Sequence, residues 1–405
     1  MRQNISCISS IKMCSSCGAC ISVCPKKAIS FGVTSLGRMF ANVDGNCVEC
    51  GLCLKVCPSY ILNGTYEDFF NLKKKNIVVG KACNRNFHLN GQSGGAVTAI
   101  LSYLFKSRKI DAALVCNTSK GAPFIVKSEQ QLKDTQKSVY TPIPMLVLLD
   151  EIRSYKSIAV VGLPCHLSGL ANVLKYKPIP IKYKLGLICD RALCGAIASG
   201  IKNYYNEKKV KDIVIKYRDK LAGVGYGYSN APISVYSSGK QIGIISSSVR
   251  QKLKQIFTAP RCLVCPDKLN VSADLVFGDP WNIKLLDENG ESLIIANTQE
   301  GCDLLNQAIK NRDLVLSCKC SSADLDKSQH ISQRREQVAV YSWLLSRHSN
   351  VSFLLKSHNG MKIRLQQCCR ALYCIFRFRL LEILPEEIVK KYIVRIIKRM
   401  VKNNE

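Results

Sequence analysis

Long apolar runs are absent from this 405-residue sequence: no stretch of about eighteen uncharged apolar residues occurs, so we expect no membrane-spanning helix. A secretory signal is also missing, because residues 1–30 contain cysteines, lysines and a proline where a signal has a continuous apolar stretch. We therefore expect a cytoplasmic protein in a reducing compartment. In that setting the 22 cysteines are expected to bind metal rather than to form disulfides.

Acidic residues are few: 29 Asp and Glu accompany 58 Lys and Arg, which gives a net charge of +29. Such an excess is typical of proteins that bind nucleic acid, an anionic membrane or acidic partners, although lysines that only solvate the surface produce it equally well. No nucleic-acid-binding motif and no basic stripe rich in aromatic residues occurs, so we expect no nucleic-acid partner. The 47% hydrophobic content is ample for buried cores, and the length suggests two or three domains.

The most informative cysteines form two tandem runs of the form C-x2-C-x2-C-x3-C-P. The first run consists of Cys14, Cys17, Cys20 and Cys24 before Pro25, and the second of Cys47, Cys50, Cys53 and Cys57 before Pro58. In bacterial ferredoxins with this pattern, three thiolates of a run bind one [4Fe–4S] cluster and the fourth binds the other. We therefore expect one cluster on Cys14, Cys17, Cys20 and Cys57, and a second on Cys47, Cys50, Cys53 and Cys24.

Zinc is the alternative metal for four thiolates. Zinc sites, however, pair C-x2-C halves and do not use two tandem runs that each end in proline. The runs therefore predict an N-terminal ferredoxin domain that transfers electrons, and they identify neither the donor nor the acceptor.

A glycine-rich turn follows the ferredoxin runs. It contains Gly91, Ser93, Gly94 and Gly95, and it precedes a helix-patterned stretch at 96–107 and an apolar strand at 112–115. A glycine turn that opens a helix can bind phosphate through free amides, or it can be an ordinary turn. It is not the G-x-G-x-x-G fingerprint, so we predict no Rossmann NAD site.

Four later cysteines lie near strand ends or in a close pair. An apolar strand at 158–161 leads to Cys165, and another at 184–190 contains Cys189. Cys262 and Cys265 form a C-x2-C pair. Ligands of α/β sheets bind at the carboxyl ends of strands, which makes this a suitable position for a site. Alternating strand and helix patterns over 77–310 indicate an α/β or mixed α+β core.

These landmarks together resemble the beta subunit family of coenzyme F420-reducing hydrogenases and dehydrogenases, over roughly residues 1–310. The matching features are the ferredoxin runs, the SGG turn at 93–95, the GLPC strand end at 162–165, Cys189, and the segments RCLVCPD and ADLVFGDPW within 261–281. Members bind FAD and an iron–sulfur cluster in this body, and they pass electrons between the flavin and a hydride carrier or substrate. Relatives include F420-dependent oxidoreductases of methanogens, chlorophyll-cycle reductases and homologues encoded in bacterial surface-polysaccharide gene clusters.

The resemblance implies that Ser93, Gly94 and Gly95 contact FAD and that a third [4Fe–4S] cluster lies near the flavin. The implied ligands of this cluster are Cys165, Cys189, Cys262 and Cys265, with Cys194 as the substitute for Cys189. The alternatives are ordinary buried thiols and a zinc-binding C-x2-C pair.

Three further residues have open roles. His166 stands where many relatives have glutamine, and it could relay a proton or only cap a local hydrogen bond. Asp279 and Trp281 could contact the flavin or belong to the core.

The predicted fold class is α+β. We expect a bacterial-type 2[4Fe–4S] ferredoxin domain at 1–62, a linker at 63–80 that leads into a short strand, an α/β flavin-binding body at 81–334, and a basic helical tail at 335–405. Near the end of the tail Val389, Tyr392, Ile393, Ile396 and Met400 recur at helical spacing among lysines and arginines. Such a helix can lie on an anionic membrane or dock on the body.

A flavin exchanges electrons in pairs and each cluster carries one, so FAD beside a chain of clusters couples two-electron to one-electron chemistry. We predict an iron–sulfur flavoprotein oxidoreductase that exchanges electrons with a redox partner protein or reduced ferredoxin and acts on a small molecule or hydride carrier. A link to surface polysaccharides is implied by the resemblance alone. The alternative is a non-catalytic electron-transfer subunit of a larger redox complex. A homo-oligomer and contact of the basic tail with the inner face of the membrane are further expectations.

Overall fold

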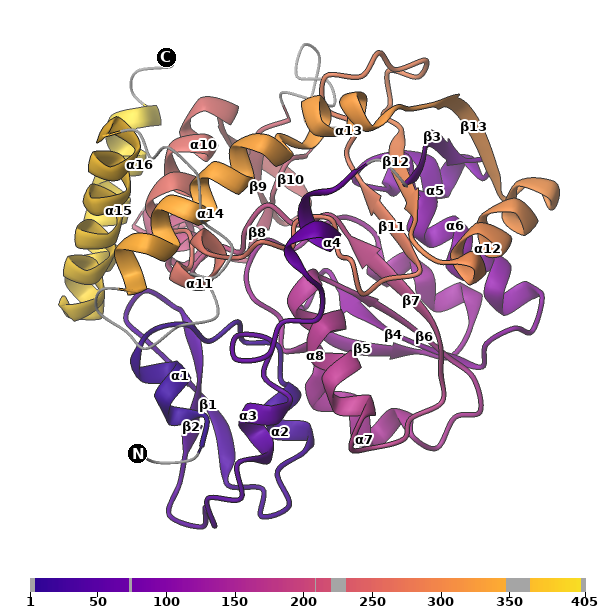
Figure 1. The fold of residues 1–405 in the computed structure, drawn as a ribbon. Helices are drawn as coiled ribbons and strands as arrows, with labels where there is room; N and C mark the ends of the chain where they lie inside the picture. Colours follow the sequence, from indigo (N-terminus) through magenta and orange to yellow (C-terminus); the bar gives the residue numbers. More distant parts are fainter. Residues whose placement is uncertain (1–3, 73–74, 208, 220–230, 347–364, 402–405) are drawn as a thin grey trace.

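The computed structural model describes residues 4–72, 75–207, 209–219, 231–346 and 365–401. It contains an N-terminal lobe, a large mixed sheet covered by helices, and a smaller sheet with its own helices (Figure 1). This mixed arrangement of helices and strands, with a separate cysteine-rich lobe at the N-terminus, confirms the predicted class of fold.

The N-terminal lobe contains both cysteine runs. Its elements are α1 (Ser6–Ser10), α2 (Ala19–Ser22), β1 (Ile29–Val33), β2 (Met39–Val43) and α3 (Leu52–Lys55). β1 and β2 pair antiparallel. The short helices α2 and α3 each begin after a glycine in the left-handed region, Gly18 with φ of +91° and Gly51 with φ of +73°. Larger residues rarely adopt this conformation, which explains the glycine inside each cysteine run.

The large sheet has eight strands in the order β13-β3-β12-β11-β7-β6-β4-β5. Their bounds are β13 (Leu314–Lys319), β3 (Asn76–Ala82), β12 (Ser292–Ala296), β11 (Leu275–Gly278), β7 (Ile181–Leu187), β6 (Ile158–Gly162), β4 (Ala112–Asn117) and β5 (Ala122–Val126). The strands β4, β6, β7 and β11 are parallel to one another, and the other pairs are antiparallel. The expected strands at 76–80, 112–115 and 158–161 are all present.

Alternate residues of each strand face two separate cores. One core contains α6 (Ala96–Lys106) and α12 (Gln299–Lys310), and the other contains α8 (Pro164–Leu174) with the short helices η2 (Met145–Leu148) and α7 (Leu149–Ile152). The remaining elements around this sheet are α4 (Tyr66–Phe70), α5 (Arg85–Asn90) and η1 (Glu129–Thr135). The start of α6 at Ala96 agrees with the helix that the sequence predicts there.

The N-terminal lobe packs directly against the rest of the protein. Its Cys17, Ala19, Val23 and Val56 belong to the same buried cluster as α8 and one face of the large sheet. The backbone amide of Leu146 donates to the carbonyl of Cys17 at 2.9 Å. The first cysteine run is therefore fixed against the body.

The smaller sheet has three antiparallel strands, and it carries the tail helices. Its strands are β8 (Ile213–Lys216), β9 (Ile233–Ser237) and β10 (Lys240–Ile245), and the helices that share its buried cluster are α9 (Ala196–Asn206), α10 (Ser247–Ile256), α15 (Leu365–Ile383) and α16 (Glu386–Val401). The helices α11 (Pro260–Leu263), α13 (Ser322–Gln329) and α14 (Ile331–Ser346) lie outside this cluster, and Leu325 of α13 belongs to a core of the large sheet. α14 runs through the expected boundary between body and tail at 334/335, so this boundary does not coincide with a break between elements.

The last helix docks on the body, which was one of the two alternatives for the tail. Val389 and Ile393 are fully buried, and Tyr392 and Ile396 are partly buried, in a cluster with α9. The side chain of Met400 lies outside the described residues. Among the described residues, no helix is long and apolar enough to cross a membrane.

The contact between α9 and α16 depends on Gly200, because a Cβ atom at this position would overlap the side chain of Ile393. We expect Gly200→Val to push α16 away from α9, to lower the free energy of unfolding by about 1–3 kcal/mol, and to expose α16 to limited proteolysis. Gly45→Val is the matched control, because no atom lies within 4 Å of a Cβ there. Equal protease resistance of the two variants would contradict this packing.

Candidate redox sites

The structure brings the predicted ligands of the first ferredoxin cluster together inside the N-terminal lobe. This inner group consists of Cys14, Cys17, Cys20 and Cys57. Burial raises the pKa of Cys20 well above its usual value, and the neighbouring thiols of the group raise it further. Burial likewise raises the pKa of Cys17 to about 11. Buried thiols of this kind release their protons when iron binds the thiolate.

The second group lies at the outer end of the lobe. Cys24, Cys47, Cys50 and Cys53 line one cavity, together with Asn4 and Pro25 among others. This outer group contains three cysteines of the second run and the fourth of the first, which is the crossed arrangement that the sequence predicts. Cys50 and the neighbouring Val48 are exposed, so this group faces solvent.

A third group forms where two parallel strands of the large sheet end. Cys165 is in the first turn of α8 after β6, Cys189 follows β7, and Cys262 and Cys265 lie on and just after α11. Burial raises the pKa of Cys165 well above its usual value, and the other three thiols add to this increase. The Asn270 amide donates to the carbonyls of Gly162 and Leu187 at 2.8 and 3.2 Å, which ties the two strand ends together.

Cys194, the substitute ligand, has a different environment. It is completely buried in the apolar cluster of the smaller sheet. Burial raises its pKa to about 12, and of the third group only Cys262 lies near it. Cys189 is therefore better placed than Cys194 to complete the third group.

The inner and third groups are adjacent. Cys17 is one of the thiols that raise the pKa of Cys165, after the larger effect of burial. Gly169 in α8 packs against the first cysteine run: a Cβ atom there would lie 3.2 Å from Ala19 Cβ and, in ordinary contact, 3.5 Å from Cys17 Sγ. Arg261, the residue before Cys262, donates to Ser59 Oγ at 2.9 Å and to the Pro58 carbonyl at 3.2 Å, just after Cys57. Two separate contacts therefore join the first ferredoxin cluster site to the third site.

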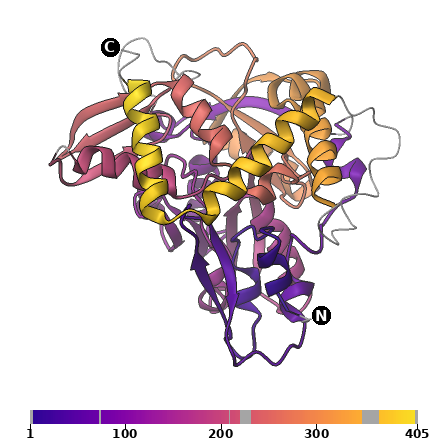
Figure 2. The ribbon, with the colours of Figure 1, turned by 90° about the vertical axis from the view of Figure 1, so that its left-hand side faces the viewer.

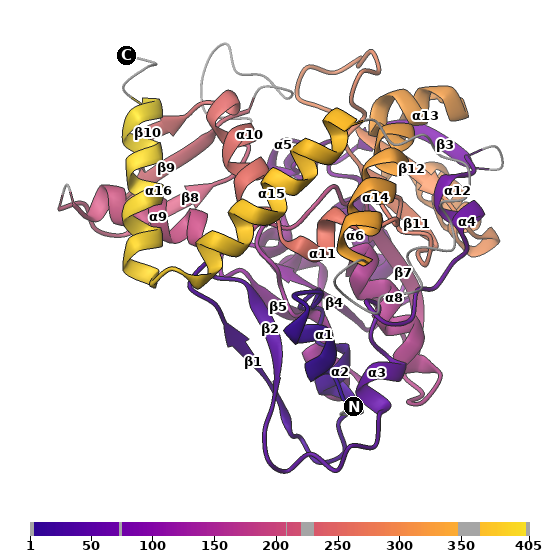
Figure 3. The ribbon, with the colours of Figure 1, turned by 60° about the vertical axis from the view of Figure 1, so that its left-hand side comes forward.

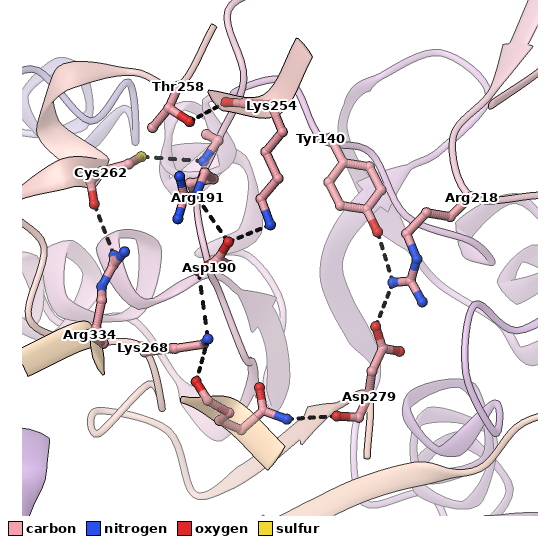
Figure 4. Close-up of polar contacts among 12 residues, drawn as sticks. Tyr140, Asp190, Arg191, Arg218, Lys254, Thr258, Cys262, Lys268, Asp279 and Arg334 are labelled. Atoms are coloured by element: carbon pink, nitrogen blue, oxygen red, sulfur yellow. Dashed lines mark hydrogen bonds and ion pairs between the residues drawn. The ribbon is translucent and has the colours of Figure 1, made fainter. Parts of the chain in front are cut away.

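Arg334 in α14 holds the C-x2-C pair, and Figure 4 shows its contact with Cys262. Its guanidinium donates to the carbonyl of Cys265 at 3.0 Å and to that of Cys262 at 2.9 Å, and its side chain is buried. The backbone amide of Ala192 lies 3.3 Å from Cys262 Sγ, where it would donate to a thiolate. A [4Fe–4S] cluster with four thiolates carries net negative charge, so a buried cation and an amide donor both stabilise it.

Further cations surround the third group through Asp190, the residue after Cys189. Asp190 pairs with Arg191 at 3.0 Å, Lys254 at 2.5 Å and Lys268 at 3.6 Å. Burial alone would raise the pKa of Asp190, but these cations outweigh it and hold the pKa well below its usual value. Burial lowers the pKa of Lys268 to about 8.

The predicted flavin-binding turn faces a second polar cluster. Ser93 donates a short hydrogen bond to Asp279, and Arg218 Nη1 donates to the same carboxylate at 2.5 Å and to Tyr140 Oη at 3.1 Å. The Arg218 guanidinium lies 4.7 Å from the centre of the Trp281 ring. Three residues that the sequence singled out, Ser93, Asp279 and Trp281, are therefore brought together around a buried arginine.

The two glycines of the turn are explained by packing inside the protein. The amide of Gly94 donates to Ser292 Oγ at 3.0 Å, and a Cβ atom there would lie 2.7 Å from the backbone nitrogen of Ser292. A Cβ atom at Gly95 would overlap the carbonyl of Phe87. The turn thus places Ser93 beside Asp279, whereas the amide of Gly94 already has a partner within the protein.

The polar cluster suits an anionic aromatic ligand such as FAD. Arg250 is buried beside Arg218 and Tyr217, and within the described chain its Nε atom has no hydrogen-bond partner. A buried guanidinium nitrogen of this kind is expected to find an anionic partner. The buried arginines therefore have the charge that an anionic cofactor such as FAD requires, and FAD at this cluster stays a prediction.

A hydrogen-bonded link joins this cluster to the third cysteine group (Figure 4). Gln329, the last residue of α13, donates through Nε2 to the carbonyl of Asp279 at 2.7 Å, and its own carbonyl accepts from Lys268 Nζ at 2.6 Å. Lys268 in turn pairs with Asp190. The third group and the candidate flavin site thus share one supporting framework.

His166 caps α8 locally. It is buried, and its Nδ1 atom accepts from the amide of Leu163 at 3.2 Å. Burial lowers its pKa to about 4, so the ring is neutral near pH 7. This favours the capping role over the proton relay.

Within the described ranges, no three His, Cys, Asp or Glu side chains converge to hold a single metal ion. A cubane cluster places a different demand on its ligands, since each cysteine binds a separate iron at its own corner. The three groups of four thiols therefore have the donor chemistry that [4Fe–4S] clusters require, and the ligand assignments stay predictions.

Comparison with known sequences defines the class of protein first. Residues 13–61 match a 4Fe-4S dicluster domain, so the chain contains an iron–sulfur domain of the ferredoxin dicluster class. Residues 77–150 match the model of the N-terminal part of the coenzyme F420 hydrogenase/dehydrogenase beta subunit, and residues 155–319 match the model of its C-terminal part. Together these two matches cover more than half of the chain. The chain belongs to the coenzyme F420 hydrogenase/dehydrogenase beta subunit family, as the resemblance predicts.

The individual relatives have low sequence identity to this chain. The chain is 31% identical to a coenzyme F420-dependent sulfite reductase of Methanocaldococcus jannaschii over 73% of its own length, but it spans only 46% of that relative. It is 25% identical to the beta subunit of an F420-dependent formate dehydrogenase of the same organism, with 66% and 71% of the two chains covered. A chain of the F420-reducing [NiFe] hydrogenase complex from Methanosarcina barkeri has the same fold, with a TM-score of 0.52, 16% identity, and 72% of this chain and 98% of that chain covered.

Sequence reasoning missed the basic residues that support the sites. Arg261 and Lys268 lie inside the segment that carries the resemblance, but nothing in their spacing distinguishes them from surface cations. Arg334 lies about seventy residues after the cysteines that it contacts, where the resemblance fades. Arg218 lies outside every motif considered. Only the fold shows that these four residues contact the candidate sites.

The role of Arg334 can be tested by Arg334→Lys, which keeps the charge but cannot reach both carbonyls with one planar fork. We expect the variant to lose about four irons per chain while the ferredoxin clusters remain, because the C-x2-C loop loses its support. Iron and sulfide analysis of protein purified without oxygen measures this. Arg335→Lys, at the exposed neighbouring position, is the control. Full iron content in Arg334→Lys would show that the loop does not need both guanidinium hydrogen bonds.

Proposed function

We propose that this protein is an iron–sulfur flavoprotein oxidoreductase that passes electrons between two ferredoxin-type clusters, a third [4Fe–4S] cluster and FAD. The observation that carries this proposal is the meeting of Cys165, Cys189, Cys262 and Cys265 directly beside Cys17 of the ferredoxin lobe. The outer, inner and third groups of thiols thus form a series between the surface of the ferredoxin lobe and the strand ends of the large sheet.

The order of the groups supports a path between the surface of the ferredoxin lobe and the body. The outer group includes the exposed Cys50, so a redox partner protein or reduced ferredoxin can approach it. The inner group is buried against α8, and the third group lies at the strand ends beyond it. Lys268 and Gln329 then connect the third group to the cluster of Asp279 and Arg218. The opposite direction of electron flow uses the same residues.

FAD, when bound, exchanges electron pairs as hydride with a small molecule and single electrons with iron–sulfur clusters. In our proposal Arg218 and Arg250 hold the anionic part of the cofactor, Ser93 is fixed beside it by Asp279, and Arg334 holds the C-x2-C loop. Because the relatives are named for coenzyme F420, we propose a hydride carrier of that type as the small molecule. A polysaccharide-linked substrate stays a prediction from the resemblance.

A second candidate is an electron-transfer subunit that serves a partner enzyme and binds no substrate. The names of two relatives favour it, since one is a subunit of an F(420)H(2) dehydrogenase from Methanosarcina mazei and the other is the formate dehydrogenase beta subunit. Reduction of the bound flavin by reduced F420 with the purified chain alone would favour the enzyme over this candidate.

We propose a reducing, cytoplasmic location for the protein, because the 22 cysteines form no disulfide and twelve of them are proposed cluster ligands. The apolar face of α16 is buried against α9. Any contact with a membrane must therefore use apolar residues other than those of the α16 pattern that the sequence suggested for the tail.

The proposed path is tested by the double variant Cys262→Ala/Cys265→Ala. We expect it to keep the ferredoxin clusters and the flavin, but to reduce the rate of flavin reduction by a ferredoxin donor by at least about a hundredfold, because the third cluster is missing. Anaerobic stopped-flow absorbance measures the rate. Cys7→Ala/Cys83→Ala, which removes two exposed thiols with no predicted ligand role, is the matched control. An unchanged rate in the first variant would refute the path.

A further inference from the structure

The helix α15 has two unlike faces. Ala371, Phe378 and Leu381 are buried against the body. On the opposite side Leu372, Phe376, Leu380 and Ile383 recur at helical spacing, and they are 53%, 69%, 45% and 75% exposed. Other exposed large apolar side chains of the described residues, such as Leu286 and Val214, are isolated from one another along the chain. A contiguous exposed apolar row marks an interaction surface.

The next helix offers positive charge on the same side of the molecule. α16 buries Val389, Ile393 and Ile397, and it exposes Lys391, Arg395 and Arg399, together with Lys398, which pairs with Glu207 at 2.7 Å. Only Leu384 and Pro385 separate the two helices. Figures 2 and 3 show them as the two arms of a V across one face of the molecule. The outer side of this V therefore joins an apolar row to a cationic face.

We propose that the outer side of α15 and α16 binds an anionic lipid surface. In this arrangement the α15 row enters the region between headgroups and acyl chains, and the α16 cations pair with acidic headgroups, as in interfacial amphipathic helices. The whole chain has a net charge of +29, which adds a long-range attraction to an anionic bilayer. Charge of the same sign on a second copy of this chain opposes self-association through this face.

The position of the V in the chain separates it from the family's shared features. The family matches end at residue 319, so both helices lie beyond them. A contact surface there lies outside the segments that match the family models. The proposal is therefore independent of the proposed redox function.

Contacts with the ferredoxin lobe hold α15 in place on its inner side. Glu382, on the inner side of α15, accepts from Arg38 Nε at 2.7 Å and pairs with Lys12, and both partners belong to the ferredoxin lobe. The Ser35 hydroxyl donates to the Glu382 carbonyl at 3.3 Å. Because α15 is already folded and anchored, it can bind a surface without the cost of ordering a disordered segment. Binding would bring the ferredoxin lobe close to the bilayer.

The test is co-sedimentation of the full-length protein with vesicles of phosphatidylcholine alone or with added phosphatidylglycerol. We expect binding only to the anionic vesicles, and weaker binding as salt is raised. Phe376→Ser/Ile383→Ser should weaken partitioning by about tenfold or more, since two exposed apolar side chains are removed from the interface. Lys391→Glu/Arg395→Glu should weaken it by a similar factor and should reduce the dependence on salt.

The control variant is Leu286→Ser/Val214→Ser, which removes two similarly exposed apolar residues elsewhere and should bind like the unmodified protein. Absorbance of the clusters and resistance to protease verify that each variant is folded. Equal binding of the α15 variant and the control would overturn the proposal. So would a stable dimer or an acidic protein partner that the α15 substitutions disrupt while binding to anionic vesicles is unaffected.

Discussion

The packing of the first cysteine run on α8 is the contact on which the proposed redox path depends. Gly169 lets α8 pack closely on Ala19, beside Cys17, and Cys165 lies one turn earlier on the same helix, just after β6. Electron transfer between clusters falls steeply with distance, so a ferredoxin lobe on a loose linker would not serve the body well. Here the lobe shares a buried apolar core with the large sheet, and its orientation is fixed by the same residues that fold the chain.

The third site also requires positive charge nearby. Four buried thiolates around a cluster are negative, and burial without compensation would be costly. Three cations supply compensating positive charge. Arg334 contacts the carbonyls of Cys262 and Cys265, Arg261 lies between the lobe and the third group, and Lys268 lies beside Asp190. The same framework continues through Gln329 to Asp279, where a second set of buried arginines faces the predicted flavin turn. Part of the large positive charge of the chain thus has a local role inside the protein.

The sequence predicts those features whose chemistry depends on local spacing. The ferredoxin runs, the strand before Cys165 and the helix after the glycine turn all follow from short patterns, and the structure contains them. The strand expected at 184–190 is β7, which ends at Leu187, so Cys189 follows this strand and is not part of it. Long-range contacts could not be predicted in this way. Arg334 and Arg218 reach their partners only through the path of the chain, and the burial of α16 depends on the absence of a side chain at Gly200. The exposed row on α15 was also missed, because an apolar helical pattern does not show which face the body covers.

The central claim is that the third cluster exists and lies next to the inner ferredoxin cluster. Electron paramagnetic resonance of the reduced protein tests this most directly, because neighbouring reduced clusters split and broaden each other's signals. We predict a spin-coupled spectrum that simplifies to the coupling of the ferredoxin pair when the third cluster is removed. A wild-type spectrum that already contains only the ferredoxin pair, or that adds an uncoupled third signal, would contradict the account.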